Sequence, residues 1–595
     1  MKTRLADYVM DFLVSRGIRQ VFMLPGGGAI FLDDALGHKS ELNYTCFLHE
    51  QALAIACEAY GQHTNTPGVG LVTSGPGSTN AITGVAAAWI DSTPCFFISG
   101  QAKRQTLKGT SGVRQMGSQE VDIVSMVSCI TKYAVTVMEP ADIRFHLEKA
   151  WHEATTGRKG PVWLDIPLDV QSTEVEVSSL RPFMPPECSC SKSCPEAVRD
   201  VVSMLEKSRR PLLLVGNGVK LAGAGKQVRD FAEKYQIPML LTWKTADFLD
   251  FDHPLNFGFP GGMGSRYANF AVQNCDFLLI LGSRLDPSLT AFNPSHFAFN
   301  AAKVMVDIDE AEMRKIPDVP LKIQADAADF MRELAGHEVK MSDTARWKSW
   351  LASLKQKYPA VIPGCDGGDA APVDLYRFTL ELCRQLTPED VIVPESSGSA
   401  GEATYQALRV KQGQSIKNAA GLGSMGFGLP YAIGSCIAMK RRRTVLINGD
   451  GAFQLNIQEL ETLKRLDLPV AIFIFDNGGY GTIANTQNNL FGGFHVGADS
   501  TSGLTLPDLL KVAAAYGLRT FEINSNGDLA RGIADTLQAG VPALCRVKVR
   551  SDHKIMPRVQ SLKLPDGTMV SKTLEEMWPY LDEAETAAIM KGPAE

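Results

Sequence analysis

The sequence has no long apolar run, no excess of basic residues and no cysteine framework, and each absence excludes a class of protein. No apolar run approaches the ~18 residues that a membrane-spanning helix needs, so we expect no membrane insertion. Lysine and arginine number 59, against 65 aspartate and glutamate residues. This balance argues against a general nucleic-acid surface, which would be basic.

The twelve cysteines are spread widely, and several of them, such as Cys95 and Cys436, lie inside apolar segments. This distribution predicts reduced thiols in a cytoplasmic protein and excludes a disulfide framework. Cys188, Cys190 and Cys194 do cluster, and a metal site is the alternative there. Because their spacing matches no standard zinc pattern and no histidine is close, we interpret this stretch as a linker.

Strand-like apolar runs alternate with helical patterns along almost the whole chain, which is typical of α/β proteins with parallel sheets. Two stretches break this rhythm: residues 172–196 are rich in Pro, Ser and Cys, and residues 356–374 in Pro, Gly and Asp. Both compositions are typical of linkers. We therefore predict three domains and a C-terminal tail, at residues 1–180, 190–345, 370–560 and 561–595.

The first and third domains are predicted to be versions of one unit. Residues 68–100 and 444–477 each follow the order strand, glycine turn, helix, strand. A helical segment rich in small residues precedes each of them, at residues 49–62 and 421–436. Such internal similarity indicates a repeated fold.

An aspartate flanked by two glycines, Asp450, directly follows the apolar run TVLI and precedes a helical pattern. The β–α–β unit must cross over right-handedly, so its two strands are parallel and adjacent, ~4.8 Å apart. Asp450 then follows the first strand and Asn477 follows the second, at the sheet edge where open α/β sheets bind ligands. Glycines and a helix start suit a phosphate, and Mg²⁺ is typically held between carboxylates and phosphates. We interpret the pair as a Mg²⁺–diphosphate site; the alternative is a tight Asp-Gly turn that binds nothing.

Five motifs, in the same order and over nearly the whole chain, resemble the large catalytic subunit of acetolactate synthase: VFMLPGGGAI, HEQALAIACEAYG, SGPGSTNAITG, GLGSMGFGLP and GDGAFQLNIQEL. The resemblance implies a thiamine diphosphate enzyme with three doubly wound parallel-sheet domains, which are pyrimidine-binding, central and diphosphate-binding. It implies that Asp450, Asn477 and the carbonyl of Gly479 bind Mg²⁺. It places Gly449, Gly451 and Ala452 in the diphosphate-binding turn.

The resemblance also implies that Glu50 faces the aminopyrimidine ring of the cofactor, where a carboxyl group would share a proton with a ring nitrogen. The alternative for Glu50 is a helix-start acid favoured by the dipole. Met425 would support the bent shape of the cofactor, although core packing is the commoner role of a methionine. The remaining implied contacts are Gly423, whose carbonyl takes the 4′-amino hydrogen bond, and Gly75, Pro76 and Asn80. In the family the site lies between two chains, so we expect a homodimer or homotetramer with Glu50 reaching across.

The middle domain resembles the flavin-binding part of acetolactate synthase in NFGFPGGMGSRYANFAVQNCDFLLILGSRLD and VMVDIDEAEM. The resemblance implies FAD, with a structural role. Its implied contacts are Gly216, Gly218, Thr242, Gly282, Arg284, Asp307, Ile308 and Asp326. Arg284 would bind the diphosphate, a task that suits a guanidinium. One position departs from the family, because Ser288 stands where a second arginine is usual.

The resemblance implies that pyruvate is decarboxylated and that its two-carbon unit is transferred to a ketone or ketoacid. Gln119 and Lys132 would line the substrate channel; a surface glutamine and a solvated lysine are the alternatives. On the acceptor side Thr486 matches the family's tryptophan and Ser118 its phenylalanine. These smaller polar residues resemble the branch that adds the unit to nucleotide-linked keto sugars. A flavin-dependent 2-oxoacid oxidase and a non-catalytic, cofactor-binding regulator stay as alternatives.

Overall fold

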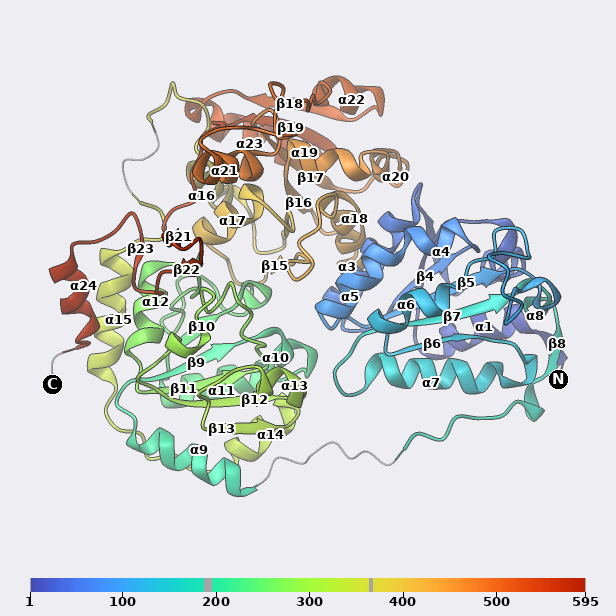
Figure 1. The fold of residues 1–595 in the computed structure, drawn as a ribbon, viewed down its shortest axis with the longest axis horizontal. Helices are drawn as coiled ribbons and strands as arrows, with labels where there is room; N and C mark the ends of the chain where they lie inside the picture. Colours follow the sequence, from blue (N-terminus) through green and yellow to red (C-terminus); the bar gives the residue numbers. More distant parts are fainter. Residues whose placement is uncertain (1, 187–194, 363–366, 594–595) are drawn as a thin grey trace.

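The computed structural model describes residues 2–186, 195–362 and 367–593, and it contains three parallel sheets with helices on both faces (Figure 1). The first sheet has six strands in the order β3-β2-β4-β5-β7-β6. Their bounds are β2 Gln20–Met23, β3 Asn43–Cys46, β4 Gly68–Val72, β5 Cys95–Gln101, β6 Tyr133–Thr136 and β7 Pro161–Pro167. The helices are α1 Leu5–Ser15, α2 Ile30–His38, α3 Glu50–Thr64, α4 Pro76–Asn80, α5 Ile82–Ile90, α6 Ile123–Val127, α7 Ile143–Thr155 and α8 Leu168–Gln171.

The central sheet has five strands in the order β10-β9-β11-β12-β13. Its strands are β9 Pro211–Val215, β10 Met239–Leu241, β11 Phe277–Leu281, β12 Ala302–Asp307 and β13 Leu321–Gln324. The helices are α9 Pro195–Lys207, α10 Asn217–Leu221, α11 Gly225–Tyr235, α12 Arg266–Asn274, α13 Glu310–Arg314, α14 Ala327–Ala335 and α15 Ala345–Lys357. Side chains of α9, α11 and α14 fill one face of this sheet, and those of α12 and α15 the other.

The third sheet again has six strands, in the order β15-β14-β16-β17-β19-β18. Its strands are β14 Val391–Pro394, β15 Ser415–Ile416, β16 Thr444–Gly449, β17 Val470–Asp476, β18 Arg519–Ile523 and β19 Ala543–Lys548. The helices are α16 Leu375–Gln385, α17 Ser399–Ala407, α18 Gly428–Ala438, α19 Asp450–Phe453, α20 Glu459–Arg465, α21 Gly481–Phe491, α22 Leu509–Ala515 and α23 Leu529–Leu537. Counted within each domain, the first and third sheets have the same strand order, which confirms the predicted repeated fold.

The first and third domains share one apolar core, because α3 lies between α5 and α18. The side chains in this layer are small. A Cβ added to Gly434 of α18 would lie 2.5 Å from the carbonyl oxygen of Ala56, and one added to Gly84 of α5 would lie 2.5 Å from the Cβ of Ala54. The small-residue segments recognised in the sequence are therefore the surfaces through which these helices approach each other.

Residues 558–593 pack on the central domain and not as a free tail (Figure 1). They form the short pairs β20 Arg558–Val559 with β23 Met577–Trp578, and β21 Ser561–Lys563 with β22 Met569–Ser571, followed by α24 Glu583–Met590. Asn269 of α12 donates to the carbonyl of Leu574 at 3.0 Å. The domain limits themselves stay a prediction. The Cys188, Cys190 and Cys194 cluster lies outside the described residues, and no described helix reaches both the length and the hydropathy that a membrane span needs.

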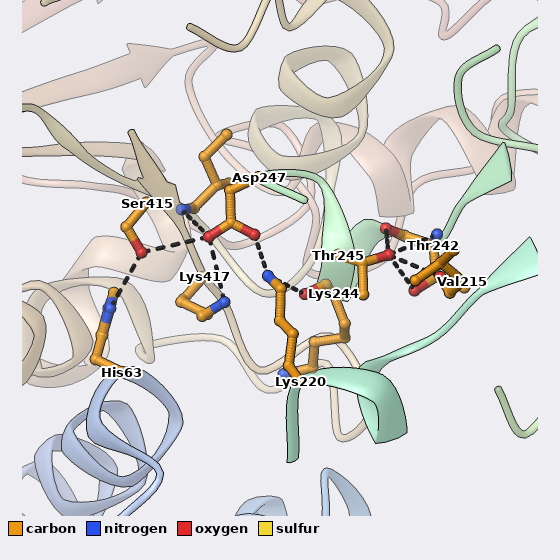
Figure 2. Close-up of polar contacts among 10 residues, drawn as sticks. His63, Val215, Lys220, Thr242, Lys244, Thr245, Asp247, Ser415 and Lys417 are labelled. Atoms are coloured by element: carbon orange, nitrogen blue, oxygen red, sulfur yellow. Dashed lines mark hydrogen bonds and ion pairs between the residues drawn. The ribbon is translucent and has the colours of Figure 1, made fainter. Parts of the chain in front are cut away.

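One buried carboxylate joins the three domains (Figure 2). Asp247 of the central domain pairs with Lys220 of the same domain and with Lys417 of the third, at 3.3 Å. Its second partner from the third domain is the backbone N–H of Ile416, at 3.2 Å. His63 of α3 completes the junction through the hydroxyl of Ser415, at 3.3 Å. Burial alone would raise the pKa of Asp247, but the two ammonium groups hold that pKa well below its ordinary range.

Candidate active site

Asp450 and Asn477 lie at the carboxyl ends of the adjacent parallel strands β16 and β17, as the β–α–β argument predicts. Asp450 begins α19 and is only 2% exposed. Its Oδ2 accepts hydrogen bonds from the backbone N–H groups of Asn477 (3.1 Å), Gly478 (2.8 Å) and Gly479 (3.1 Å). The aspartate therefore shapes the turn after β17 through Oδ2, while its Oδ1 accepts a hydrogen bond from the N–H of Gly451 at 2.8 Å.

Three oxygen atoms meet in this turn. The amide oxygen of Asn477 lies 2.8 Å from the carbonyl oxygen of Gly479 and 3.3 Å from Oδ1 of Asp450. Oxygen atoms this close repel one another unless the amide of Asn477 is turned, so that its N–H group donates, or a cation lies between the oxygens. The donor set suits Mg²⁺, whose ligands are hard oxygens in a near-octahedral shell. Burial raises the pKa of Asp450 to about 7, and a bound cation would favour the ionised carboxylate instead.

The backbone beside this turn is open to a ligand. A Cβ added to Gly449 would meet no atom within 4 Å, whereas one added to Gly451 would lie 2.5 Å from the ring of Tyr480. Ala452 follows on the same helical turn and is buried. The backbone at Gly449 is therefore open, while the backbone at Gly451 is closely packed against Tyr480. A diphosphate can approach the open backbone.

Glu50 is the first residue of α3, just beyond the carboxyl end of β3, and it is 8% exposed. Its Oε2 accepts a hydrogen bond from the amide of Asn80 at 3.0 Å. Asn80 ends α4, whose first residue is Pro76 and whose N-cap is Gly75. Glu50 and this turn therefore lie together beyond the carboxyl ends of β3 and β4.

Gln119 joins the same edge through Gly75. Gly75 has φ +61°, and a Cβ there would lie 2.4 Å from the backbone oxygen of Gln119. Gln119 itself has φ +58°, a conformation that is uncommon for a residue with a side chain. Such strain is typical of positions where a side chain is held for a function.

The two sheet edges meet within one chain. The amide of Asn456, six residues after Asp450, donates to Oε1 of Gln51 at 3.1 Å and to the carbonyl of Gly426 at 2.8 Å. Gln51 follows Glu50, and Gly426 follows Met425, whose side chain is 38% exposed. Gly423 in the same loop has φ +64°. The expectation that Glu50 reaches across to a second chain stays a prediction, since these contacts join the helix of Glu50 to the third domain of the same chain without placing its carboxyl group at Asp450.

A cavity of about 700 Å³ lies between the central domain and the two others. All eight residues expected to contact FAD line it: Gly216, Gly218, Thr242, Gly282, Arg284, Asp307, Ile308 and Asp326. Cβ atoms on Gly216 and Gly218 would lie 2.3 Å from the oxygen and 2.7 Å from the Cα of Gly282, so bare backbone forms this wall. The volume lies within the range of cofactor pockets, and the residues present fit a dinucleotide.

Comparison with known proteins finds three domains of one enzyme family in order along the chain. The N-terminal TPP binding domain, the central domain and the C-terminal TPP binding domain of thiamine pyrophosphate enzymes match residues 3–126, 198–334 and 396–547. The chain is 32% identical to acetolactate synthase isozyme 1 large subunit of Escherichia coli (strain K12), over 93% of this chain and 95% of that protein. It is 34% identical to the acetolactate synthase large subunit of Parasynechococcus marenigrum (strain WH8102), over 93% of this chain and 89% of that protein.

The chain belongs to the acetolactate synthase large-subunit family. It is an enzyme of this thiamine diphosphate-dependent type, with the three-domain α/β fold that the family resemblance implies.

One residue assigned from the family resemblance lies apart from the others. Lys132 directly precedes β6, at the amino-terminal edge of the first sheet, while Glu50 lies beyond the carboxyl edge. Its ammonium group donates to the backbone carbonyls of Glu153 and Thr156, the latter at 2.8 Å. Lys132 is thus used to close the end of α7, and the structure does not bring it to the site of this chain.

The structure adds two charged residues that the acetolactate synthase motifs did not indicate. Lys244, two residues after Thr242, pairs with Asp91 of the first domain at 2.6 Å and donates to the carbonyl of Asn418 in the third. Glu395 follows β14, is 1% exposed, and accepts from the N–H of Gly428 at 3.0 Å. Burial raises the pKa of Glu395 to about 7. The sequence could have indicated Glu395, because this acid directly follows the apolar run VIVP, as Asp450 does its own strand.

Proposed function

We propose that the chain decarboxylates pyruvate and transfers the remaining two-carbon unit to the carbonyl carbon of a ketone or ketoacid. Pyruvate loses carbon dioxide, a carbon–carbon bond forms to the acceptor, and the acceptor oxygen takes a proton. The observation that supports this most is the hydrogen bond between Asn456 and Gln51. It ties the helix that begins at Glu50 to the segment that follows the Asp450 turn, and the same amide binds the loop of Met425.

The residues of the chain have separable tasks in this proposal. Asp450, Asn477 and the carbonyl of Gly479 would hold Mg²⁺, and the open backbone at Gly449 would receive the diphosphate. When bound, thiamine diphosphate supplies the carbon nucleophile. Glu50 exchanges a proton at Oε1, because Asn80 already occupies Oε2. Burial of this carboxyl group excludes water from the exchange.

Three further features belong to the same proposal. FAD would fill the cavity along Gly216, Gly218 and Gly282. The protein would act in the cytoplasm as a homodimer or homotetramer, in keeping with the curated relatives, whose names identify them as large subunits. In this assembly the active sites would lie at the subunit interface, with Glu50 of one subunit facing the diphosphate-binding domain of another.

The acceptor in its sharper version is a nucleotide-linked keto sugar. Support comes from Thr486 on α21, which is exposed and donates to the carbonyl of Thr482 at 2.9 Å. A small hydroxyl side chain there leaves more room than the tryptophan of the family resemblance, and it favours a larger or more polar acceptor.

The test is to incubate the protein with pyruvate, thiamine diphosphate and Mg²⁺, and to identify the product with 2-ketobutyrate or a keto-sugar nucleotide as acceptor. Carbon dioxide release together with a carboligation product is expected, and the E50Q variant should lose both. Bleaching of bound flavin by pyruvate without an acceptor would point to the oxidase alternative. If the protein releases no carbon dioxide from pyruvate, the proposed donor is wrong.

A further inference from the structure

The large cavity extends beyond the residues expected to bind FAD and reaches the edge of the third sheet. Glu395 and Ser396, which line it, follow the end of β14, next to β16 and its Asp450. Gly398 lines it as well, and a Cβ there would lie 3.4 Å from the hydroxyl of Thr482. Thr482 lies in the first turn of α21, just after the turn of Asn477. The far end of the cavity is thus next to the predicted metal site.

Arg558 lines this end of the cavity, and its backbone is fixed on both sides. The amide of Gln406 donates to the carbonyl of Pro557 at 2.7 Å. The N–H of Val559 donates to the carbonyl of Gly262 at 2.7 Å, and the N–H of Gly262 donates to the carbonyl of Ser288 at 2.8 Å. Gly262 therefore links β20, which contains Arg558, to Ser288 through two backbone hydrogen bonds. Ser288 is the position at which the acetolactate synthase family has a second arginine.

The charge of Arg558 has no anion to neutralise it. Its Nε is buried without a hydrogen-bond partner, and among the described residues no carboxylate lies within 4.0 Å of its guanidinium. Glu402 lines the same part of the cavity. Burial raises the pKa of Glu402, and the positive charge of Arg558 offsets part of that rise. Arg558 is half-buried, and a buried N–H such as its Nε costs free energy unless an acceptor binds it.

The other cations of the cavity wall are accounted for. Arg158 pairs with Asp309 and Glu312, Lys244 with Asp91, and Lys159 donates to Asn65. Arg284 is the position expected for the FAD diphosphate. Arg558, which lines the cavity together with Glu402 of α17, is left for a second anion.

We propose that Arg558 binds the anionic group, carboxylate or phosphate, of the acceptor substrate and so selects charged acceptors. Both groups accept two parallel hydrogen bonds from a guanidinium. Ser561 and Ser571 of the β21–β22 pair and Ser396 line the same end and can bind further oxygens of the acceptor. This assignment rests on the proposed carboligase function, for which it names a specificity residue.

The experiment compares acceptors with and without an anionic group, at saturating pyruvate. The pairs are 2-ketobutyrate with its methyl ester, and dihydroxyacetone phosphate with dihydroxyacetone. We expect R558M to raise KM for the charged member of the pair that the enzyme uses by about 10- to 100-fold, and KM for the neutral member less than about twofold. R558K should restore part of the difference. The pair that responds distinguishes a carboxylate from a phosphate.

The matched control is R550M, because Arg550 is exposed and pairs only locally with Asp552 at 2.9 Å. Equal loss of charged and neutral acceptors in R558M would overturn the assignment, as would loss of FAD with the acceptor preference unchanged. If the wild-type protein releases no carbon dioxide from pyruvate, the proposed function fails on its own. Calorimetric titration of wild-type and R558M protein with the same four compounds then still tests Arg558, and equal affinities for the charged compounds would overturn it.

Discussion

Asn456 donates one hydrogen bond to Oε1 of Gln51 at 3.1 Å and a second to the carbonyl of Gly426 at 2.8 Å. One amide group thereby fixes the distance between the helix that begins at Glu50 and the loop that carries Met425. The backbone of Asn456 comes just after α19, which begins at Asp450. The geometry of the site therefore depends on a residue that is expected to touch neither pyruvate nor metal.

Replacement of Asn456 by alanine should lower kcat/KM for carboligation by about 100-fold, because reacting groups displaced by about 1 Å lose that much rate. The two lost hydrogen bonds should also cost about 2 kcal/mol of stability. Steady-state kinetics and thermal unfolding measure the two effects. N43A, on the exposed edge strand β3, is the control. Unchanged kinetics in N456A would show that the two halves are held together by other contacts.

Replacement of Gly75 by alanine should displace Gln119, since the new Cβ would lie 2.4 Å from its backbone oxygen. Gly540 offers a matched control, because its φ is +67° and a Cβ there meets no atom within 4 Å. Both variants place an alanine at positive φ, at a cost of at least about 1–2 kcal/mol, but G75A alone should also lose activity, by about tenfold or more. If G540A loses as much activity as G75A, the contact with Gln119 is irrelevant.

Glu395 should make stability depend on pH. Burial raises its pKa from 4.5 to about 7, so the folded state binds the proton more tightly than the unfolded state does. The stability from this group is fully present below pH 4.5 and is lost as pH rises toward 7, by up to about 3 kcal/mol. E395Q should therefore gain stability relative to wild type between pH 4.5 and 7, and no more above that. Thermal unfolding across this range, with the exposed E389Q as control, would contradict this if the difference between E395Q and wild type stayed constant.

Sequence reasoning found the positions that local rules determine. Asp450 and Asn477 follow strands of one β–α–β unit, and the handedness of that unit alone places them at one edge. The same argument separates Lys132 from Glu50 within one chain, because a residue that precedes a parallel strand lies at the opposite edge from one that follows it. Family resemblance alone assigned Lys132 to the channel.

Contacts between distant segments could not be predicted. Gly75 and Gln119 meet because the chain folds back over 44 residues, and Arg558 of the C-terminal segment is held at the cavity by hydrogen bonds at Pro557 and Val559. A glycine turn at Gly75 and a charge at Arg558 are visible in the sequence, but neither shows which distant segment it meets. That α3 meets α18 of the same chain was equally hidden, because small-residue helix faces show that a close partner exists but not which one.

Replacement of Asp247 by asparagine should weaken the junction of the three domains. The change leaves Lys220 and Lys417 without their shared anion, and an uncompensated buried charge costs about 3–5 kcal/mol. Burial already lowers the pKa of Lys417 to about 7, so this lysine is sensitive to the loss. Calorimetry should show a lower unfolding temperature for D247N than for D252N, an exposed neighbour. The double variant D247N/K417M should recover part of the loss, because it removes the stranded cation along with its partner. A double variant less stable than D247N would show that Lys417 stabilises the junction through its packing and not through its charge.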